Sequence, residues 1–206
     1  VLLRGSFEMD SFNSRVGPYA QSRRTNGGIG TNASRIASID ADGSVIVNGN
    51  LLIGPGGNPA SAIRLMGSAI VTGSQTASTD AATFPCPAPP DGVQNTGVLS
   101  LNGSEVRTLQ SGTYWFSQLR LNGSSSLQTT GPVILYVSGP ISLNGSSNII
   151  GISSRPPDMI VKVTDAFDVD IQGSALLNGA IYAPRSFIRL NGSAEVYGAL
   201  IGREVQ

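Results

Sequence analysis

The amino-acid sequence predicts an all-β protein, a right-handed parallel β-helix (β-solenoid) with coils of about 20 residues and one proline-rich loop insertion. Three observations carry this prediction. A short motif recurs at a spacing of about 20 residues, which is too short for helical hairpin repeats of roughly 33 residues. Apolar and polar residues alternate in short runs, as they do in strands. The 26 glycines and 12 prolines supply the turns between such strands.

The recurring motif has an apolar residue, asparagine or a similar residue, glycine, and a small polar residue. We expect the apolar side chain to point into the core, the asparagines of successive coils to stack, and the glycine to take a left-handed turn. Two related copies are Leu65-Met66-Gly67-Ser68 and Ile171-Gln172-Gly173-Ser174. The predicted structural turn ladder consists of Asn48, Asn102, Asn122, Asn144 and Asn191, with Gly49, Gly103, Gly123, Gly145 and Gly192.

One coil can be followed from Gln118 to Gly139. A short strand ends at Leu121, a second contains Leu127, and a third begins at Val133. Asn-Gly and Gly-Pro pairs separate the three runs. Three strands and three turns in about 20 residues form the unit of a parallel β-helix, whose coils stack at about 4.8 Å.

The sequence divides into residues 1–28, which we expect to form an N-terminal extension or cap, and residues 29–206, the β-helix domain with an inserted loop at 74–96. The insert contains the rigid segment Phe84-Pro85-Cys86-Pro87-Ala88-Pro89-Pro90. Cys86 is the only cysteine, so it forms no internal disulfide. Its thiol is either inert or forms a bond to another chain.

Charge and composition exclude several classes of function. The 13 basic and 13 acidic residues give zero formal net charge, which argues against nucleic-acid binding and polybasic membrane binding. Histidine is absent, which excludes histidine-based triads and histidine-ligated metals. No apolar run approaches 18 residues, so we expect no membrane span in this chain. Because the sequence starts at Val1 without a signal-peptide pattern, we expect a processed chain or an excised domain.

Few residues suggest a ligand or a reaction. Asp165, Asp168 and Asp170 are the candidates for a calcium site, since the last two share a face of an extended segment. Solvated turn carboxylates are the alternative. A polysaccharide lyase would also need a base and a cluster of cations, for which only Lys162 and Arg189 are available. We therefore expect no enzyme and no cofactor.

The aromatic residues offer one candidate binding surface. Strand alternation places Tyr114 and Phe116 on one side of the chain and Trp115 on the other. One set is expected to be core. An exposed Trp115 would be a platform for a sugar ring or a packing contact.

Several stretches of turn and core residues match a known pattern. They are Asp10 to Ser14, Gly17-Pro18-Tyr19, Gly30 to Ala33, Val47 to Gly57, Ser111 to Phe116, Gly131 to Gly139, Gly179 to Pro184 and Val196 to Gly202. On these stretches the chain resembles the uncharacterised right-handed β-helix domain of bacterial PilX-like, type IV pilus-associated surface proteins. The resemblance covers nearly the whole chain from Asp10 onward. It implies a pilus association and carries no established catalytic residues.

The predicted function is that of an extracellular or cell-surface structural protein that self-assembles into a filament or surface layer. The two ends of the chain are apolar β segments, and open strand edges tend to pair with other strands. Head-to-tail contacts that do not close generate filaments. The expected partner is another copy, with pilus components or surface polysaccharide as further partners. The residues expected to make the assembly contacts are Val1, Leu2, Leu3, Ile201 and Val205.

Two other functions remain open. The chain could be an adhesin-like module that binds carbohydrate or protein through the inserted loop, because binding residues often lie on loops mounted on rigid scaffolds. The other hypothesis, third after the structural protein and the adhesin-like module, is a polysaccharide-active β-helix enzyme.

Overall fold

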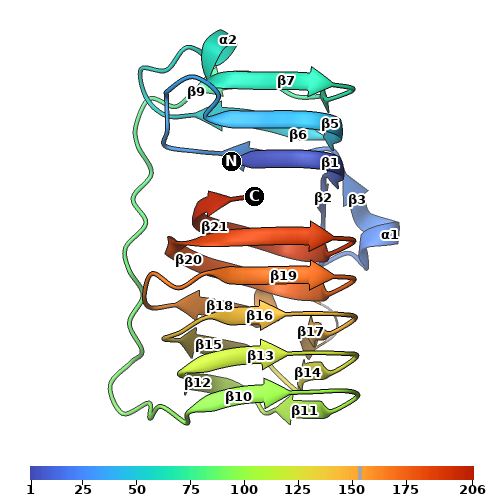
Figure 1. The fold of residues 1–206 in the computed structure, drawn as a ribbon, viewed down its shortest axis with the longest axis vertical. Coiled ribbons are helices and arrows are strands. Elements are labelled where there is room, and N and C mark those ends of the chain that lie inside the picture. Colours follow the sequence, from blue (N-terminus) through green and yellow to red (C-terminus); the bar gives the residue numbers. More distant parts are fainter. Residues whose placement is uncertain (153–154) are drawn as a thin grey trace. The chain divides into compact units, whose positions relative to one another are not determined.

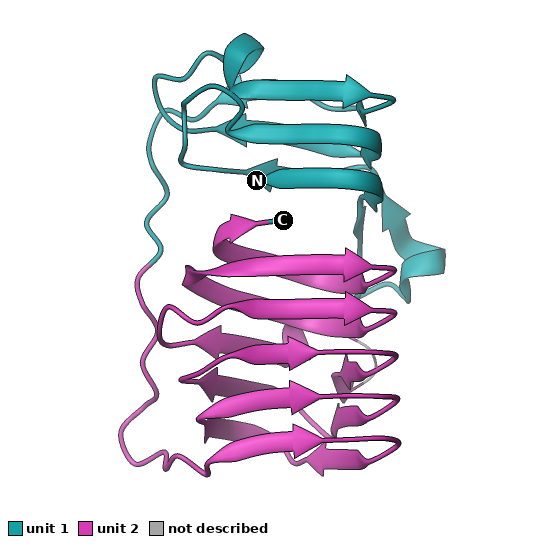
Figure 2. Ribbon diagram, viewed as in Figure 1, with its two compact units in different colours: residues 1–84, 206 teal, residues 85–205 magenta. Residues whose placement is uncertain are grey.

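The computed structural model of the protein describes residues 1–152 and 155–206, and these form a β-solenoid of about eight coils (Figure 1). Almost all strand pairs are parallel, and within each unit one coil passes to the next by a right-handed connection (Figure 1). The predicted fold class is therefore confirmed. The chain divides into two compact units, residues 1–84 with Gln206 (unit 1) and residues 85–205 (unit 2) (Figure 2).

Unit 1 contains short strands and two single-turn helices. Its elements are β1 (Leu2–Met9), β2 (Ser11–Phe12), α1 (Tyr19–Ser22), β3 (Arg23–Arg24), β4 (Gly27–Gly30), β5 (Ile39–Val47), β6 (Gly49–Ile53), α2 (Pro59–Ala62), β7 (Ile63–Gly67), β8 (Ile70–Val71) and β9 (Gln75–Ala77).

Two parallel sheets face each other across the core of unit 1. One has the strand order β1-β5-β7, with β8 also pairing with β5, and the other has the order β4-β6-β9. Alternate side chains point inward, so Leu3, Ile39, Ala41, Leu51 and Ile53 are buried together. The expected extension at residues 1–28 thus contributes strands to the solenoid. Only the antiparallel pair β2–β3 and helix α1 form an excursion from its first coil.

Unit 2 contains the more regular coils. Its elements are β10 (Val98–Leu101), β11 (Val106–Leu109), β12 (Gly112–Phe116), β13 (Gln118–Leu121), β14 (Ser126–Thr129), β15 (Val133–Val137), β16 (Ile141–Leu143), β17 (Asn148–Ile150), the 3-10 helix η2 (Pro156–Asp158), β18 (Met159–Val163), β19 (Val169–Gly173), β20 (Leu176–Gly192) and β21 (Glu195–Val205).

Three faces surround the core of unit 2. The first stacks β10, β13, β16, β19 and the end of β20, the second stacks β11, β14, β17 and the start of β20, and the third stacks β12, β15, β18 and the middle of β20. The coil predicted from Gln118 to Gly139 corresponds to β13, β14 and β15. The buried residues of the core are mostly Leu, Ile and Val, as expected for strands whose inner face meets other strands.

Residues 78–97 connect the units without forming a strand of their own, so the insertion begins after β9. Ala82 exchanges two hydrogen bonds with the side chain of Asn32 in unit 1, at 2.7 and 2.9 Å. Within unit 2, the Tyr182 hydroxyl donates to the carbonyl of Pro85 at 2.6 Å. The connecting segment is therefore tied to both units at defined points.

Candidate functional site

An asparagine ladder runs along one corner of unit 2. Asn122 Nδ2 donates to Asn102 Oδ1 at 3.0 Å, and Asn144 Nδ2 donates to Asn122 Oδ1 at 3.0 Å. Each of these asparagines follows a leucine that points into the core. The ladder joins three successive coils, which identifies the motif in this stretch as an architectural device.

The glycines that follow these asparagines form a second column. Gly103, Gly123 and Gly145 have φ angles of 60°, 74° and 73°, in the left-handed region that favours glycine. A Cβ on Gly123 would lie 2.8 Å from the carbonyl oxygen of Gly103. Gly173 and Gly192 continue the column at 75° and 80°. Both backbone conformation and close approach therefore require glycine here.

Unit 1 has the same turn but different side chains. The left-handed glycines there are Gly5, Gly43 and Gly67, with φ of 81°, 116° and 67°. The residues that precede the first two are Arg4 and Asp42, and Arg4 Nη1 lies 2.7 Å from Asp42 Oδ2. An ion pair thus fills the position that the amide ladder fills in unit 2.

Asn48 and Gly49, which we expected in the ladder, lie outside the turn column. Asn48 Nδ2 donates instead to Glu8 Oε1 at 3.1 Å. Gly49 is not in the left-handed region, but a Cβ there would lie 1.1 Å from the carbonyl oxygen of Gly27. Glycine is needed at this corner for close backbone approach rather than for a turn.

Asp40 is a nearly buried carboxylate on β5, with a side chain 8% exposed. It accepts hydrogen bonds from Arg64 Nε at 2.9 Å and from Arg4 Nη2 at 2.8 Å. The hydrogen bond from Arg64, with the positive charges of both guanidinium groups, lowers the pKa of Asp40 against the opposing effect of burial. This cluster stabilises the sheet β1-β5-β7 by bridging three strands.

The carboxylates considered for calcium are arranged around an arginine. Arg189 Nη1 lies 2.8 Å from Asp168 Oδ2 and 3.3 Å from Asp170 Oδ1. Asp165 instead accepts a hydrogen bond from Thr164 Oγ1 at 3.2 Å. Across residues 1–152 and 155–206, no three acidic, cysteine or histidine side chains form a group suited to a metal ion. The guanidinium group of Arg189 supplies the positive charge between Asp168 and Asp170.

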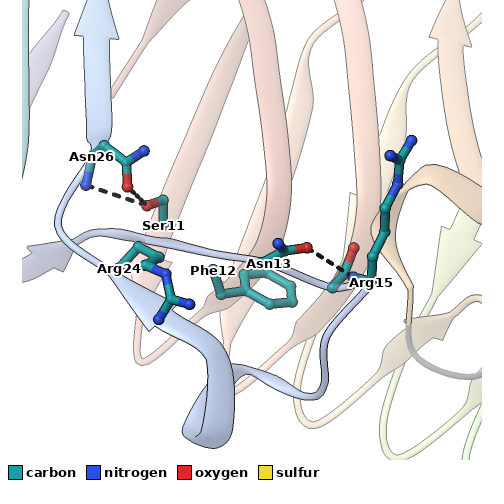
Figure 3. Close-up of a pocket in the computed structure, with 7 residues that line it drawn as sticks. Ser11, Phe12, Asn13, Arg15, Arg24 and Asn26 are labelled. Carbon is teal, nitrogen blue, oxygen red and sulfur yellow. Dashed lines mark hydrogen bonds between the residues drawn. The ribbon is translucent and has the colours of Figure 1, made fainter.

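The excursion from the first coil contains a cleft of about 480 Å³. The side chains in its wall bond to one another: Ser11 Oγ donates to Asn26 Oδ1 at 2.7 Å, and Asn13 Oδ1 accepts from the Arg15 N–H at 3.1 Å (Figure 3). The guanidinium groups of Arg15 and Arg24 point in different directions (Figure 3). The polar groups are therefore not arranged around a common point where an anion could bind.

An aromatic column lies on the outer side of the third face of unit 2. Trp115, Tyr136, Lys162 and Tyr182 occupy one register position in successive coils. Lys162 Nζ lies 5.3 Å from the centre of the Tyr136 ring, within the range of a cation–π contact. Tyr136 is only 6% exposed, and the Tyr182 hydroxyl is bound by the connecting segment. Trp115 is itself half-buried, with its Nε1 donating to Ser138 Oγ at 3.2 Å.

The first coil of unit 2 has its outer edge closed by its own residues. In inner coils the asparagine N–H donates to a leucine carbonyl of the preceding coil, as Asn122 does to Leu101 at 3.0 Å. In the first coil, the Asn102 N–H donates instead to Glu105 Oε2 at 2.6 Å. Glu105 stands where the following coils have the buried serines Ser125 and Ser147. The Glu105 carboxylate thus accepts the hydrogen bond that, in the inner coils, a leucine carbonyl of the preceding coil accepts.

Residues 95–97 cover the edge of β12. The Thr96 N–H donates to the carbonyl of Trp115 at 2.9 Å, and the Ser117 N–H donates to the carbonyl of Gly97 at 2.8 Å. Asn95 and Trp115 also form an isolated parallel bridge. The last residues of the connecting segment thus occupy the place of a neighbouring strand.

The last coil of unit 1 differs, because its edge is apolar. β7 is one of the two terminal strands in the order β1-β5-β7. Leu65 and Met66 are 36% and 37% exposed, and Ile70 in β8 is 54% exposed. In the part of the chain that the structure describes, no further strand pairs with β7 beyond β5. Sequence reasoning did not select these residues, although Leu65-Met66-Gly67-Ser68 was recognised as a copy of the motif.

The terminal residues expected to make assembly contacts are less accessible. Leu3 is buried, whereas Val1, Leu2, Ile201 and Val205 are half-buried. Leu2 to Met9 pair in continuous parallel register with Asp40 to Val47. Val205 pairs with Ile188 and Ile201 pairs with Tyr182. Leu2 and Leu3 thus belong to the folded strand β1, and Ile201 and Val205 belong to β21.

Comparisons with known proteins bear on unit 2. Within the described residues, no helix has the length and apolar character needed to cross a membrane. Neither a curated protein nor a solved structure matches the chain. Residues 117–206, which run from the residue before β13 to the last residue and make up less than half of the chain, match a family described as a domain of unknown function (DUF7305).

Proposed function

We propose that this chain is an extracellular structural subunit that associates with further copies of itself through the edges of its solenoid coils. The observation that carries the proposal is the apolar edge of unit 1, where Leu65, Met66 and Ile70 are more than one third exposed beside the terminal strand β7. An exposed edge strand with apolar side chains is a template for pairing with another chain.

The electrostatics of the chain favour such pairing. The formal net charge is zero, so no long-range repulsion opposes the approach of two copies. Near the edge, the charge of Arg64 is already matched by Asp40 at 2.5 Å. A partner strand could therefore approach β7 without leaving a new charge unpaired.

A location at the bacterial cell surface and an association with pili are part of this proposal. They rest on the resemblance of the turn and core stretches, such as Gly131 to Gly139, to the β-helix domain of PilX-like proteins. The proposal assigns no catalytic step to the chain. Its function would follow from rigidity and from contacts between coils.

The direct test is the mass of the purified chain in solution, measured by light scattering after size-exclusion chromatography over a wide range of concentration. We expect particles of at least twice the chain mass of 21.2 kDa. Particles that remain at 21.2 kDa at the highest concentration would overturn the proposal.

A second function is favoured by the aromatic column of unit 2. Trp115, Tyr136 and Tyr182 occupy one register position in their respective coils, and the half-buried Trp115 offers part of an aromatic ring that is suited to contact a sugar ring or a proline-rich segment. The chain would then be a binding module of the adhesin type. If the wild-type chain is monomeric and binds a surface polysaccharide, and Trp115→Ala abolishes that binding, this function replaces the first.

A further inference from the structure

We infer that the aromatic column of unit 2 is a recognition surface for extended proline-rich peptides, and that residues 85–90, the proline-rich segment, occupy it in the free chain. The ligand class is a peptide whose prolines keep it extended and whose main-chain carbonyls accept hydrogen bonds from the column. The segment and the column both belong to unit 2, so the inference holds whether or not copies of the chain associate.

Two ties fix the path of the chain along the column. At one end, the Tyr182 hydroxyl donates to the Pro85 carbonyl at 2.6 Å. At the other end, the Thr96 N–H donates to the Trp115 carbonyl at 2.9 Å. Tyr182 and Trp115 have the same register position in coils three steps apart. The chain therefore crosses the coils between them, and its course beside the coils of unit 2 in Figure 2 agrees with this path.

The proline-rich segment is long enough to cross the whole column. Coils stack about 4.8 Å apart, so three steps cover about 14 Å. An extended proline-rich chain rises about 3.1 Å per residue, so the run from Pro85 to Pro90 covers about 16 Å. A turn follows at once, in which the Val93 N–H donates to the Pro90 carbonyl at 3.2 Å. One extended run thus matches the length of the column and then reverses.

Burial distinguishes two sides of the segment. Pro87 and Pro89 are half-buried, whereas the residues directly before and after each of them are exposed. On the column, Tyr136 is only 6% exposed, although its side chain lies on the outer side of the sheet. The Lys162 ammonium group covers one part of this ring, at 5.3 Å from its centre. We attribute the remaining cover to the proline-rich segment, which passes this coil between its two ties.

The chemistry of the column suits this kind of ligand. Proline fixes φ and has no N–H, so a proline-rich segment stays extended with its carbonyls free to accept hydrogen bonds. Such segments dock on surfaces lined by aromatic side chains. Tyr182 supplies a hydroxyl donor at one end of the column, and Trp115 supplies a half-buried ring at the other. A ligand that is rigid before it binds loses little conformational entropy on binding.

Covalent connection makes the chain's own segment a strong competitor for the column. A ligand that is joined to its site by a short flexible linker has an effective concentration of about 1 mM. The segment can occupy the column only if its intrinsic Kd is below that value. A separate peptide of equal affinity would displace little of the segment at micromolar concentration. Weakening the segment should therefore uncover the column for an added peptide.

The test adds a synthetic peptide to two forms of the full chain. The peptide has the sequence of residues 82–92 with Cys86→Ser, which prevents oxidation. One form is wild type, and the other, the loosened variant, combines Pro85→Ser, Pro87→Ser, Pro89→Ser and Pro90→Ser. Circular dichroism checks that both have the same fold.

Isothermal titration calorimetry measures binding of the peptide. The emission of Trp115, the only tryptophan of the chain, reports whether the peptide lies at the column. We expect the loosened variant to bind with a Kd below about 1 mM and with a change in Trp115 emission. The wild-type chain should bind several times more weakly, because its own segment competes.

Two controls separate recognition of the prolines from general loosening. A peptide with serine in place of its four prolines should not bind the loosened variant. In that variant, adding Tyr182→Phe should weaken the proline peptide by about two- to tenfold, because one hydrogen bond is lost. Tyr114→Phe is the matched control, since the Tyr114 hydroxyl also donates to a main-chain carbonyl, that of Gln110 at 3.0 Å. This control should leave the affinity unchanged.

Several results would overturn the inference. They are absence of binding to the loosened variant at about 10 mM peptide, equal binding of the serine peptide, and binding that leaves both Trp115 emission and the effect of Tyr182→Phe absent. If the loosened variant binds a neutral glucan hexamer at Trp115 but not the peptide, the column is a sugar site instead. None of these results bears on self-association, which is tested by the mass of the wild-type chain in solution.

Discussion

Asn122 and Asn102 are joined by a side-chain hydrogen bond of 3.0 Å, although they are 20 residues apart in sequence. Asn122 is also the acceptor for Asn144, so its amide uses both its donor and its acceptor along the solenoid axis. The carbonyl of one amide polarises the next, as in other hydrogen-bonded chains. Asn122 is therefore the central member of this three-residue ladder.

Replacing Asn122 by alanine should remove two of these hydrogen bonds and lower the free energy of unfolding by about 1–2 kcal/mol. Chemical denaturation followed by circular dichroism measures the change. Arg120→Ala, on the exposed outer side of the same strand, is the control and should change stability by no more than about 0.5 kcal/mol. Equal effects of the two substitutions would show that the ladder contributes nothing.

Gly123→Val should destabilise the fold by more than Gly103→Val does. Both positions have left-handed φ, so each substitution forces a β-branched residue into strained backbone at a cost of about 1–3 kcal/mol. Only at Gly123 would the new side chain also meet the carbonyl of the preceding coil, because a Cβ on Gly103 has no atom within 4 Å. Thermal unfolding of the two variants separates backbone strain from close approach. Equal losses would mean that the close approach is relieved by a small shift of the coil.

Acid should destabilise unit 1 through Asp40. The pKa of this carboxyl is lowered in the folded chain from its usual value of 3.8, mainly by the hydrogen bond from Arg64. Folding therefore favours the deprotonated form, and the resulting stability is present above pH 3.8 and is lost as the pH falls through the lower folded value. We expect Asp40→Asn to unfold at lower temperature than wild type at pH 7 and the difference to shrink in strong acid. A difference that grows as the pH falls would contradict this sign.

Chelation should leave stability unchanged. Arg189 already lies 2.8 Å from Asp168, so the carboxylates of this segment do not need a divalent cation to balance their charge. Adding excess EDTA should not shift the melting temperature, and adding calcium should not raise it. Arg189→Gln should lower the melting temperature, and calcium should not restore it. Calcium rescue of that variant would show that the segment can form a cation site once the arginine is removed.

The regular coils of unit 2 could be predicted from sequence because their turn carries one unvarying signal. Leucine, asparagine, glycine and serine occur together at Leu101 to Ser104, Leu121 to Ser124 and Leu143 to Ser146, and each part has a separate structural cause. The leucine is buried, the asparagine stacks and the glycine has positive φ.

Unit 1 was harder to predict, because its turn column keeps only part of that signal. The copies there are Leu3-Arg4-Gly5-Ser6, Ala41-Asp42-Gly43-Ser44 and Leu65-Met66-Gly67-Ser68. An ion pair can stand in for an amide ladder at the solvent-facing position, so that position is free to vary. Matching on asparagine selected Asn48-Gly49, which lies at a different corner. A search for an apolar residue, any outward residue, glycine and serine would have found the correct column.

The apolar edge of unit 1 and the closed edge of unit 2 could not be predicted in the same way. Glu105 has no special neighbours in sequence, and its role appears only because the Asn102 N–H lacks a preceding coil. Likewise, the exposure of Leu65 depends on β7 being the last strand of its sheet, which no local pattern encodes.

The bond from the Ser124 N–H to the Gly103 carbonyl recurs between later coils, for example from Ser146 to Gly123 and from Ser193 to Gly173. Each coil is consequently held by the coil before it and the coil after it, and stability in such an array is approximately a sum of nearest-neighbour contributions. Duplication of one whole coil, such as residues 118–139, would preserve this register and add one more copy of the same contacts. Duplication of part of a coil would place turn residues beside strands of the neighbouring coil and break this register. Length is thus the property that evolution can change in small steps, while the cross-section stays fixed.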